Sequence, residues 1–183
     1  MSRTDFSQMH CSIARSLDIL GDSWTPLILR DLLLGFTQYE EIRENLGIST
    51  NVLSDRLASL MEHGVVERRR YGNHPKRFDY RLTPKGEDAI PIILAMVAWG
   101  DRWEAGQPGP PTQVVHHSCG RTTRATVHCS ECGELLRLQD LTYHRGPGSR
   151  RGPGTELLQT HLEPAWEGAG QPPSGASGLH PPR

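Results

Sequence analysis

The sequence has little that would direct the chain to a membrane or to an oxidising compartment. Residues 1–8 are polar and lack the apolar core and cleavage site of a signal peptide. No apolar run is long enough to span a bilayer. The chain has 4 cysteines, and without a secretory signal they favour metal or redox chemistry over a disulfide framework. We therefore expect a cytoplasmic protein.

Patterns that carry catalysis are also missing. We find no nucleophile paired with a base, no phosphate-binding loop and no paired carboxylates, so the sequence does not predict an enzyme. The formal net charge of -1 excludes a protein that is polycationic over its whole surface. A length of 183 residues leaves room for one ordinary domain and a small appendage.

The most informative stretch runs from Ile48 to Arg81. It predicts a helix that opens at Ser49, a good N-cap, and ends at Gly64, which suits a helix end. The apolar stripe of this helix is Leu53, Leu57 and Leu60. A strand, a turn at 72–75 and a second strand at 78–82 then predict a hairpin. A helix with a small polar face followed by a basic hairpin is typical of a winged helix-turn-helix protein, whose helix enters the major groove.

Positive charge is concentrated on this hairpin and its base. Between Arg68 and Lys85 the only acid is Asp79. The basic residues there are Arg68, Arg69, Arg70, Lys76, Arg77, Arg81 and Lys85. A solvated charged hairpin would show the same run, but beside a helix-turn-helix pattern we favour contact with a phosphate backbone.

Three shorter helices are predicted before this stretch. Apolar residues at helical spacing indicate the first two, over residues 11–20 and 24–34. Ser23 is the candidate cap of the second helix. Thr37 and Glu40 form a capping-box pattern that opens the third, which ends at Gly47. The short link from Gly47 to the next helix matches the helix-turn-helix signature.

After the hairpin, Thr83 and Pro84 predict the start of a long helix that ends near Trp103. Its large apolar residues are Ile90, Ile92, Ile93, Leu94, Met96, Val97, Trp99 and Trp103. This surface is too wide for one stripe against a small domain. We therefore favour a homodimer helix, paired with Ile13 and Leu17, over a fully buried core helix. A dimer would also suit a palindromic DNA operator.

Composition divides the chain into parts of different character. The predicted order is a flexible arm (1–8), a winged helix-turn-helix DNA-binding and dimerisation domain (9–104), a linker (105–113), a zinc-ribbon-like segment (114–145) and a Gly/Pro-rich disordered tail (146–183). The predicted fold class is mainly α with a small β-hairpin wing.

Two short motifs in residues 114–145 have the spacing of metal ligands. Cys129 and Cys132 are separated by two residues and followed by Gly, and His116 and Cys119 repeat this pattern. Each motif predicts a knuckle in which backbone amides turn towards the sulfur. Together they would hold structural Zn²⁺ with three thiolates and one imidazole, and so small a segment needs such help to fold.

Two alternatives stay open for this segment. His117 or His128 could replace His116 as the fourth ligand. Cys129 and Cys132 alone could be a redox pair, but such pairs usually open a helix in a thioredoxin-like context that is absent here, so we favour zinc. A closed site of four ligands leaves no position for a reactive water.

Four stretches together resemble the HxlR-type transcription regulators, which are related to the MarR group. They are CSIARSLDILGDSW (11–24), ILRDLLLG (28–35), ISTNVLSDRL (48–57) and YRLTPKG (80–86). The resemblance covers about Cys11 to Trp103 and implies a dimeric winged-helix DNA-binding protein that acts near promoters. Longer members of that family are also similar after the winged helix, with a cysteine-rich tail such as His116 to Gly133.

The resemblance also bears on Cys11. Several family members use a cysteine at the matching position to sense electrophiles or oxidants. A thiol near a helix N-terminus can have a lowered pKa, and the thiolate is the reactive form. The alternative is a buried structural cysteine, and the proline that usually follows in the family is Ser12 here. Both readings stay open.

The candidate DNA contacts are Ser49, Thr50, Asn51, Ser54 and Arg56 on the helix, and Arg69, Arg70, Lys76 and Arg77 on the wing. Asn51 is the best base reader because an amide can pair with adenine. Ser49 could be a cap alone, and Arg56 could instead pair with Asp55 or Glu62. We expect a dimeric repressor with an oxidant or small-molecule inducer. The alternative is a zinc-stabilised protein–protein interaction module, which would not need a basic wing.

Overall fold

The computed structural model describes residues 6, 8–70 and 78–164. The chain divides into two compact units, Arg15–Leu136 and a second unit made of Met1–Ala14 with Arg137–Arg183. The predicted linker, 105–113, therefore lies inside the larger unit. No helix among the described residues is both long and apolar enough to cross a membrane.

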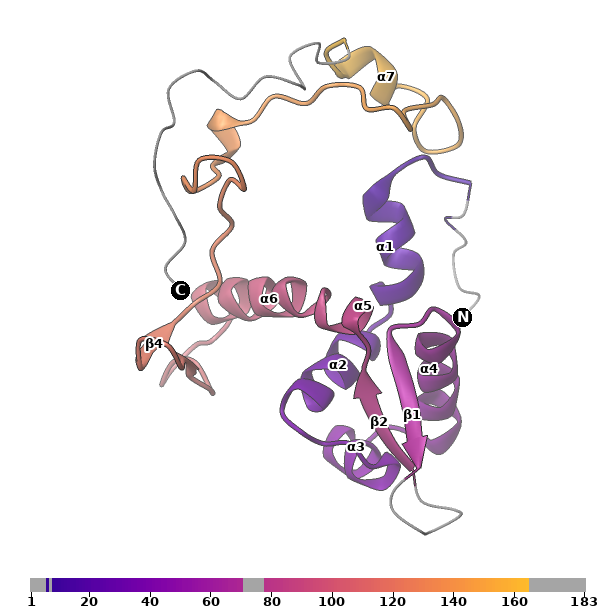
Figure 1. The fold of residues 1–183 in the computed structure, drawn as a ribbon, viewed down its shortest axis with the longest axis vertical. Helices are drawn as coiled ribbons and strands as arrows, with labels where there is room; N and C mark the ends of the chain where they lie inside the picture. Colours follow the sequence, from indigo (N-terminus) through magenta and orange to yellow (C-terminus); the bar gives the residue numbers. More distant parts are fainter. Residues whose placement is uncertain (1–5, 7, 71–77, 165–183) are drawn as a thin grey trace. The chain divides into compact units, whose positions relative to one another are not determined.

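The structure is mainly helical with a small antiparallel hairpin, as predicted (Figure 1). Its elements up to the second hairpin are α1 (Ser12–Leu20), α2 (Thr25–Leu33), α3 (Tyr39–Leu46), α4 (Thr50–Glu62), β1 (Val66–Arg70), β2 (Phe78–Leu82), α5 (Pro84–Glu87), α6 (Ile90–Trp103), β3 (Val114–His116) and β4 (Arg121–Thr123).

Besides the start of α1, the described residues of the smaller unit form two short elements. They are a 3₁₀ turn, η1 (Leu138–Asp140), and a helical turn, α7 (Leu158–His161). A parallel bridge joins His144 to Glu163, and Thr155 is buried. Residues 146–164 of the predicted disordered tail therefore have local structure, and residues 165–183 lie outside the described part of the chain.

The core of the larger unit contains apolar residues of α2, α3 and α4, including the predicted stripe of α4. Its fully buried large side chains include Ile28, Leu29, Ile42, Leu53, Leu57, Leu60 and Val66. Complete burial of each such side chain contributes about 1.5–3 kcal/mol to stability before other costs are counted. The stripe of α4 thus faces inward, which leaves its small polar residues outside.

The capping box of α3 lies one residue later than predicted. The N-cap is Gln38, and Glu41 is its partner, in place of Thr37 and Glu40. The Glu41 carboxylate accepts hydrogen bonds from the backbone amides of Gln38 (3.0 Å) and Thr37 (3.3 Å). One acid therefore satisfies two amides at this helix start.

The start of α2 also differs from the prediction, which chose Ser23 as the cap. Asp22 accepts instead, through Oδ1, from the backbone amides of Trp24 (2.8 Å) and Thr25 (3.0 Å). A carboxylate suits a helix N-terminus because it meets both the orphan amides and the positive end of the helix dipole.

The hairpin β1–β2 forms the predicted wing. Its register pairs Val66 with Leu82 and Arg70 with Phe78. The wing is joined to α3 because Gln38 forms an antiparallel bridge with Asp79, and because the Tyr80 amide donates to the Thr37 carbonyl at 2.8 Å. The residue that caps α3 is therefore also the attachment point of the wing.

The single long helix predicted over 84–103 is two helices, α5 and α6. Pro91 lies in the first turn of α6. Because proline has no amide hydrogen, it cannot continue the bonding ladder from α5, whereas it fits a new helix start. The expectation of one continuous helix was therefore wrong, although the apolar residues lie on α6 as expected.

The junction before α5 is closely packed. Thr83 donates to the Gly64 carbonyl at 2.6 Å, and Lys85 donates to the His63 carbonyl at 2.8 Å, so both hold the chain at the end of α4. Gly86 is buried here, and a Cβ added to it would lie 2.2 Å from the Val65 carbonyl oxygen. Only glycine allows the backbone to approach this closely.

Candidate nucleic-acid interface

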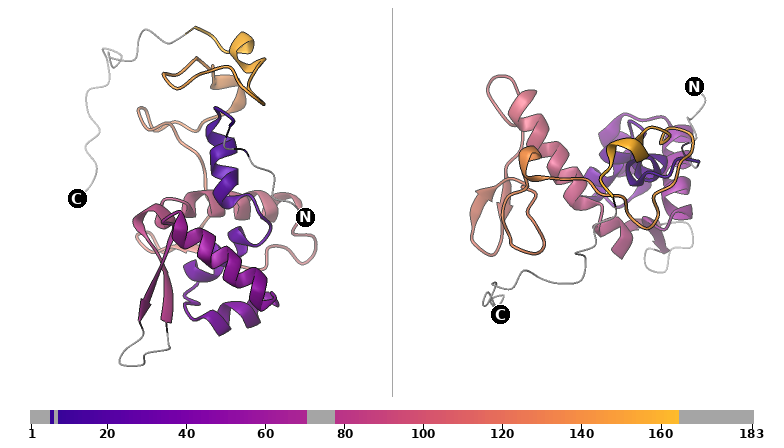
Figure 2. Two further views of the ribbon diagram at one scale, coloured as in Figure 1. Left: turned by 90° about the vertical axis from the view of Figure 1, so that its right-hand side faces the viewer. Right: turned by 90° about the horizontal axis from the view of Figure 1, so that it is seen from above.

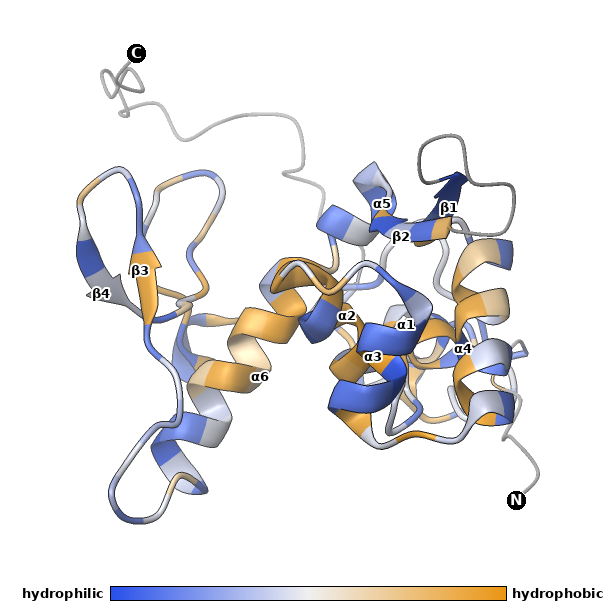
Figure 3. Ribbon diagram, turned by 90° about the horizontal axis from the view of Figure 1, so that it is seen from below, coloured by the Kyte–Doolittle hydropathy of each residue, from blue (hydrophilic) through white to orange (hydrophobic). Residues whose placement is uncertain are grey.

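The outward face of α4 carries the predicted base-reading residues. Ser49, Thr50, Asn51 and Ser54 are all exposed. Ser49 is also the N-cap, because its hydroxyl accepts from the Val52 amide at 3.4 Å. α4 lies beside the wing (Figure 2). The β1 strand is strongly hydrophilic (Figure 3). A small polar helix face and a basic strand therefore lie next to each other.

Tyr39 packs against the core, and its hydroxyl also connects the two helices of the helix-turn-helix, which the sequence did not predict. Its hydroxyl donates to the Thr50 carbonyl at 2.8 Å and lies 2.9 Å from the Ser54 hydroxyl. A phenol has one hydrogen, so Ser54 must be the donor in the second bond. This leaves the Ser54 oxygen as an acceptor on the outward face. Tyr39 thereby positions the first turns of α4.

Arg56 is directed away from this face. It pairs with Asp22 at 3.6 Å, and both side chains are mostly buried. The structure thus favours the ion-pair alternative for Arg56, but with Asp22 rather than Asp55 or Glu62. Arg56 is therefore not among the proposed DNA contacts.

The three arginines of β1 have different surroundings. The Cζ atom of Arg68 lies 4.2 Å from the centroid of the Phe78 ring, and Arg69 Nη2 forms an ion pair with Glu67 Oε1 at 2.5 Å. Arg70 is exposed and has no ion pair among the residues that the structure describes. The wing candidates Lys76 and Arg77, and the predicted turn at 72–75, lie outside the described residues.

Asp31 is a buried acid that the sequence analysis did not single out. Its side chain is fully buried and accepts from Asn45 Nδ2 at 2.8 Å and from Arg30 Nη2 at 2.7 Å. Since Asn45 is near the end of α3, these bonds hold α3 against α2. The available signal was an acid inside the apolar run ILRDLLLG, where a buried charge needs partners.

α6 exposes the apolar surface that was predicted to need a partner. Its outward residues are Ile92, Met96, Trp99 and Trp103, and Trp99 and Trp103 are each 61% exposed. Ile13 and Leu17 of α1 are exposed as well. Figure 3 shows the hydrophobic character of α6. Contiguous exposed apolar residues of this size usually mark an interaction surface.

Both cysteine motifs form turns that close with the same kind of hydrogen bond. The Gly120 amide donates to the His116 carbonyl at 2.8 Å, and the Gly133 amide donates to the Cys129 carbonyl at 2.9 Å. Both glycines have positive φ, 65° and 75°. The two motifs therefore form two separate turns, and their role as zinc knuckles stays a prediction.

The side chains of the motifs are only partly assembled. His116 Nδ1 lies 3.5 Å from Cys119 Sγ. Hydrogen bonds from the backbone amides of Cys132 and Glu131, and then from the Cys132 thiol, hold the pKa of Cys129 below its usual range. Within the described part of the chain, no group of three or more His, Cys, Asp or Glu side chains stands ready to hold a metal ion.

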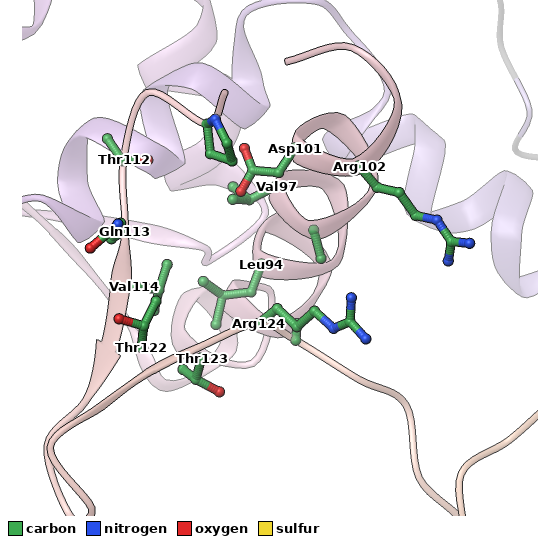
Figure 4. Close-up of a pocket in the computed structure, with 13 residues that line it drawn as sticks. Leu94, Val97, Asp101, Arg102, Thr112, Gln113, Val114, Thr122, Thr123 and Arg124 are labelled. Atoms are coloured by element: carbon green, nitrogen blue, oxygen red, sulfur yellow. The ribbon is translucent and has the colours of Figure 1, made fainter. Parts of the chain in front are cut away.

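A cavity of about 570 Å³ lies between α6 and the β3–β4 hairpin (Figure 4). Its apolar lining includes Leu94, Val97 and Val114, and Arg102 and Arg124 also line it. In Figure 4 the two guanidinium groups extend on the same side of the cavity. These α6 residues differ from the exposed stripe that contains Met96 and Trp99.

Comparisons with known proteins agree with this arrangement. The model of the HxlR-like helix-turn-helix family matches residues 19–108. The uncharacterised HTH-type transcriptional regulator Rv3095 of Mycobacterium tuberculosis is 37% identical over 137 residues, 75% of this chain and 87% of that protein. The uncharacterised HTH-type transcriptional regulator YvaP of Bacillus subtilis is 37% identical over 98 residues, 53% of this chain and 91% of that protein.

Two solved structures are similar over most of the chain. The crystal structure of PA1607, a proposed transcription factor, has a TM-score of 0.70 and 32% identity, and the match covers 78% of this chain and 100% of that one. PA1374 of Pseudomonas aeruginosa, also a proposed transcription factor, has a TM-score of 0.53 and 36% identity, and the match covers 83% and 100%. A match this long extends beyond the winged helix.

Proposed function

Because this chain belongs to the HxlR-like helix-turn-helix family of transcription regulators, we propose that it represses transcription in the cytoplasm as a homodimer on a palindromic DNA operator. The observation that carries this proposal is the exposed polar start of α4, which the Tyr39 hydroxyl ties to α3, in a domain whose strand β1 is rich in arginine. The chain acts by binding, and we assign it no catalytic step.

The proposed contacts divide into base readers and phosphate binders. Thr50, Asn51 and Ser54 face the major groove, and Asn51 pairs with an adenine edge. Arg69 and Arg70 contact phosphates beside the groove, where cations raise affinity on every sequence. Lys76 and Arg77 are proposed for the same role from the sequence alone. Ser49 caps α4 and can add a backbone amide contact at the helix start.

The proposed dimer interface is the exposed apolar stripe of α6. A second copy of the chain is the partner that a symmetric apolar stripe fits, since each copy buries the other's surface. A dimer also places two recognition helices on successive major grooves, as a palindromic operator requires. Occupancy of a promoter by such a dimer excludes polymerase, so repression needs no further surface.

We propose two routes for induction. The first is chemical modification of Cys11, which is half-buried directly before α1. The second is a small molecule in the cavity beside α6. Its volume lies in the usual range for ligand sites, and its apolar walls with two arginines against one acid, Asp101, fit an aromatic or aliphatic carboxylate. Either event would act on helices that flank the proposed dimer interface.

The route through Cys11 is tested by operator binding before and after treatment with diamide. Loss of binding in the parent, with binding retained in Cys11→Ser, supports sensing by Cys11. Equal loss in both proteins removes the idea. For the cavity, Ala98→Trp should fill the space and abolish any carboxylate-induced release of DNA.

The proposed function is tested by selecting bound fragments from genomic DNA with the purified full chain. Enrichment of sites with inverted repeats, followed by reduced transcription from those promoters in vitro, supports the proposal. A protein that enriches no DNA even in dilute salt would favour the alternative, a zinc-stabilised protein-interaction module that uses the winged helix for docking.

A further inference from the structure

We propose that His116, Cys119, Cys129 and Cys132 bind one Zn²⁺ per chain as a structural centre, with His116 and not His117 or His128 as the imidazole ligand. The proposal rests on residues outside the DNA-binding face, and it stands or falls independently of operator binding. Three thiolates and one imidazole are a donor set that suits tetrahedral zinc.

The first support is the equivalence of the two turns. Each places its two candidate ligands three residues apart and follows the second ligand with a glycine at positive φ. Each also closes with a hydrogen bond from that glycine to the carbonyl of the first ligand, at 2.8 and 2.9 Å. This equivalence gives His116 the position in its turn that Cys129 has in the other. His117 is out of step with this spacing.

The second support is the setting of each turn at the tip of a hairpin. The first lies between β3 and β4, where His116 pairs with Arg121. The second is flanked by the bridge between His128 and Leu135 and by a bond from the Leu136 amide to the Val127 carbonyl at 3.0 Å. Two such hairpins with ligands at their tips are the parts of a zinc ribbon.

The third support is the distance between His116 and Cys119. Ligand bonds of about 2.0–2.1 Å for nitrogen and 2.3 Å for sulfur, at a tetrahedral angle, put the two ligand atoms about 3.6 Å apart. The observed separation of His116 Nδ1 and Cys119 Sγ is 3.5 Å. This pair therefore has the spacing of one edge of a zinc tetrahedron.

His128 is engaged differently. Its Nδ1 lies 2.8 Å from the Gly133 carbonyl, and its Nε2 lies 2.8 Å from the Thr126 hydroxyl. A carbonyl only accepts, so Nδ1 carries the hydrogen, and Nε2 could bind metal only by giving up Thr126. His128 thus braces the second turn from the side.

The segment has little else to hold its two hairpins together. Val115, Val127 and Leu135 are each at least 40% exposed, so no apolar core joins them. The ligand pairs are formed separately among the described residues. Binding of Zn²⁺ would bring the two pairs together, and its free energy would appear as folding of the segment.

The test uses the purified full chain and measures bound metal by mass spectrometry, with Co²⁺ substitution as a second readout. We expect one Zn²⁺ per chain and the visible absorption of tetrahedral Co²⁺ with thiolate ligands. Cys132→Ser and His116→Ala should each lose most of the metal after dialysis against a weak chelator. His117→Ala and His128→Ala should keep it. His116→Cys should also keep it, with a Co²⁺ spectrum shifted to that of four thiolates.

Three results would overturn the proposal. A parent protein that binds no Zn²⁺ when purified under reducing conditions excludes the centre. If His117→Ala or His128→Ala loses the metal while His116→Ala keeps it, another histidine is the ligand and the assignment of His116 is wrong. A Cys129–Cys132 disulfide that forms with equal ease in the presence of Zn²⁺ supports a redox pair instead. Operator binding by the same samples is read separately, so failure of the DNA proposal remains distinguishable.

Discussion

The wing offers a quantitative test through Arg70, whose guanidinium has no ion pair among the described residues. Each phosphate contact contributes about −0.9 to the slope of log K against log salt. A dimer carries Arg70 twice, so Arg70→Ala should flatten the slope by about 1.8. Over a fourfold rise in salt, the variant should therefore lose roughly 12-fold less affinity than the parent.

Arg69 provides a matched comparison on the same strand. It already pairs with Glu67, and a phosphate contact would have to compete with that carboxylate. Arg69→Ala should therefore flatten the slope less than Arg70→Ala does. Arg15→Ala, on exposed α1, removes the same charge far from the wing in the sequence and should leave the slope unchanged.

The assay is fluorescence anisotropy of a labelled operator titrated with protein at several KCl concentrations. The reasoning is refuted if Arg70→Ala keeps the parental slope, or if Arg15→Ala flattens it equally. In the first case the wing does not contact phosphate through this residue. In the second case only the net charge matters, and the placement of arginine on β1 carries no meaning.

Four other predictions address base reading, positioning, packing and assembly. Asn51→Ala should reduce the preference for the original base pair at one operator position by about 1–3 kcal/mol of binding free energy. The measurement is the affinity for singly substituted operators, and an equal loss of affinity for all of them would contradict base reading. Tyr39→Phe should weaken operator binding by about 0.5–1.5 kcal/mol per lost hydrogen bond while far-UV circular dichroism stays parental, and unaltered affinity would remove its positioning role. Gly86→Ala should destabilise by about 1–3 kcal/mol in urea unfolding, because its Cβ meets the Val65 carbonyl; an unchanged midpoint would show that the backbone can yield. Trp99→Glu should convert the dimer to a monomer, because it puts a charge into the apolar stripe of α6. The molar mass is measured by light scattering, and a persistent dimer would place the interface elsewhere.

Local patterns predicted α4 well because each signal acts within one helix. Ser49 caps the helix, the stripe of Leu53, Leu57 and Leu60 is buried, and Gly64 follows the end at φ 66°. These signals depend on hydrogen bonds and side-chain spacing within about four residues. The polar outward face then follows, since a helix that buries one face against the core exposes the opposite face to solvent.

The start of α3 was misplaced by one residue because the sequence fits two registers. Thr37 with Glu40 and Gln38 with Glu41 both satisfy a capping pattern. The choice depends on Gln38, which is held in an extended conformation by its bridge to Asp79. That contact joins residues about forty positions apart, so no local pattern could reveal it.

Arg56 and Tyr39 show the same limit at the candidate site. The partner of Arg56 is Asp22, in the loop before α2, rather than a neighbour on its own helix. The hydroxyl of Tyr39 reaches Thr50 on the next helix. Charge alone placed Arg56 among the DNA contacts, and no local pattern predicted the bond from the Tyr39 hydroxyl to the next helix.

The sequence by itself determined α1 to α4, the two strands of the wing, the excess of apolar surface on α6 and the spacing of the two cysteine motifs, because each depends on residues that are neighbours in the chain. Only the tertiary structure decided the ion-pair partner of Arg56, the hydroxyl contacts of Tyr39 and the hydrogen bonds of His128. Those properties depend on what lies against each side chain once the elements pack.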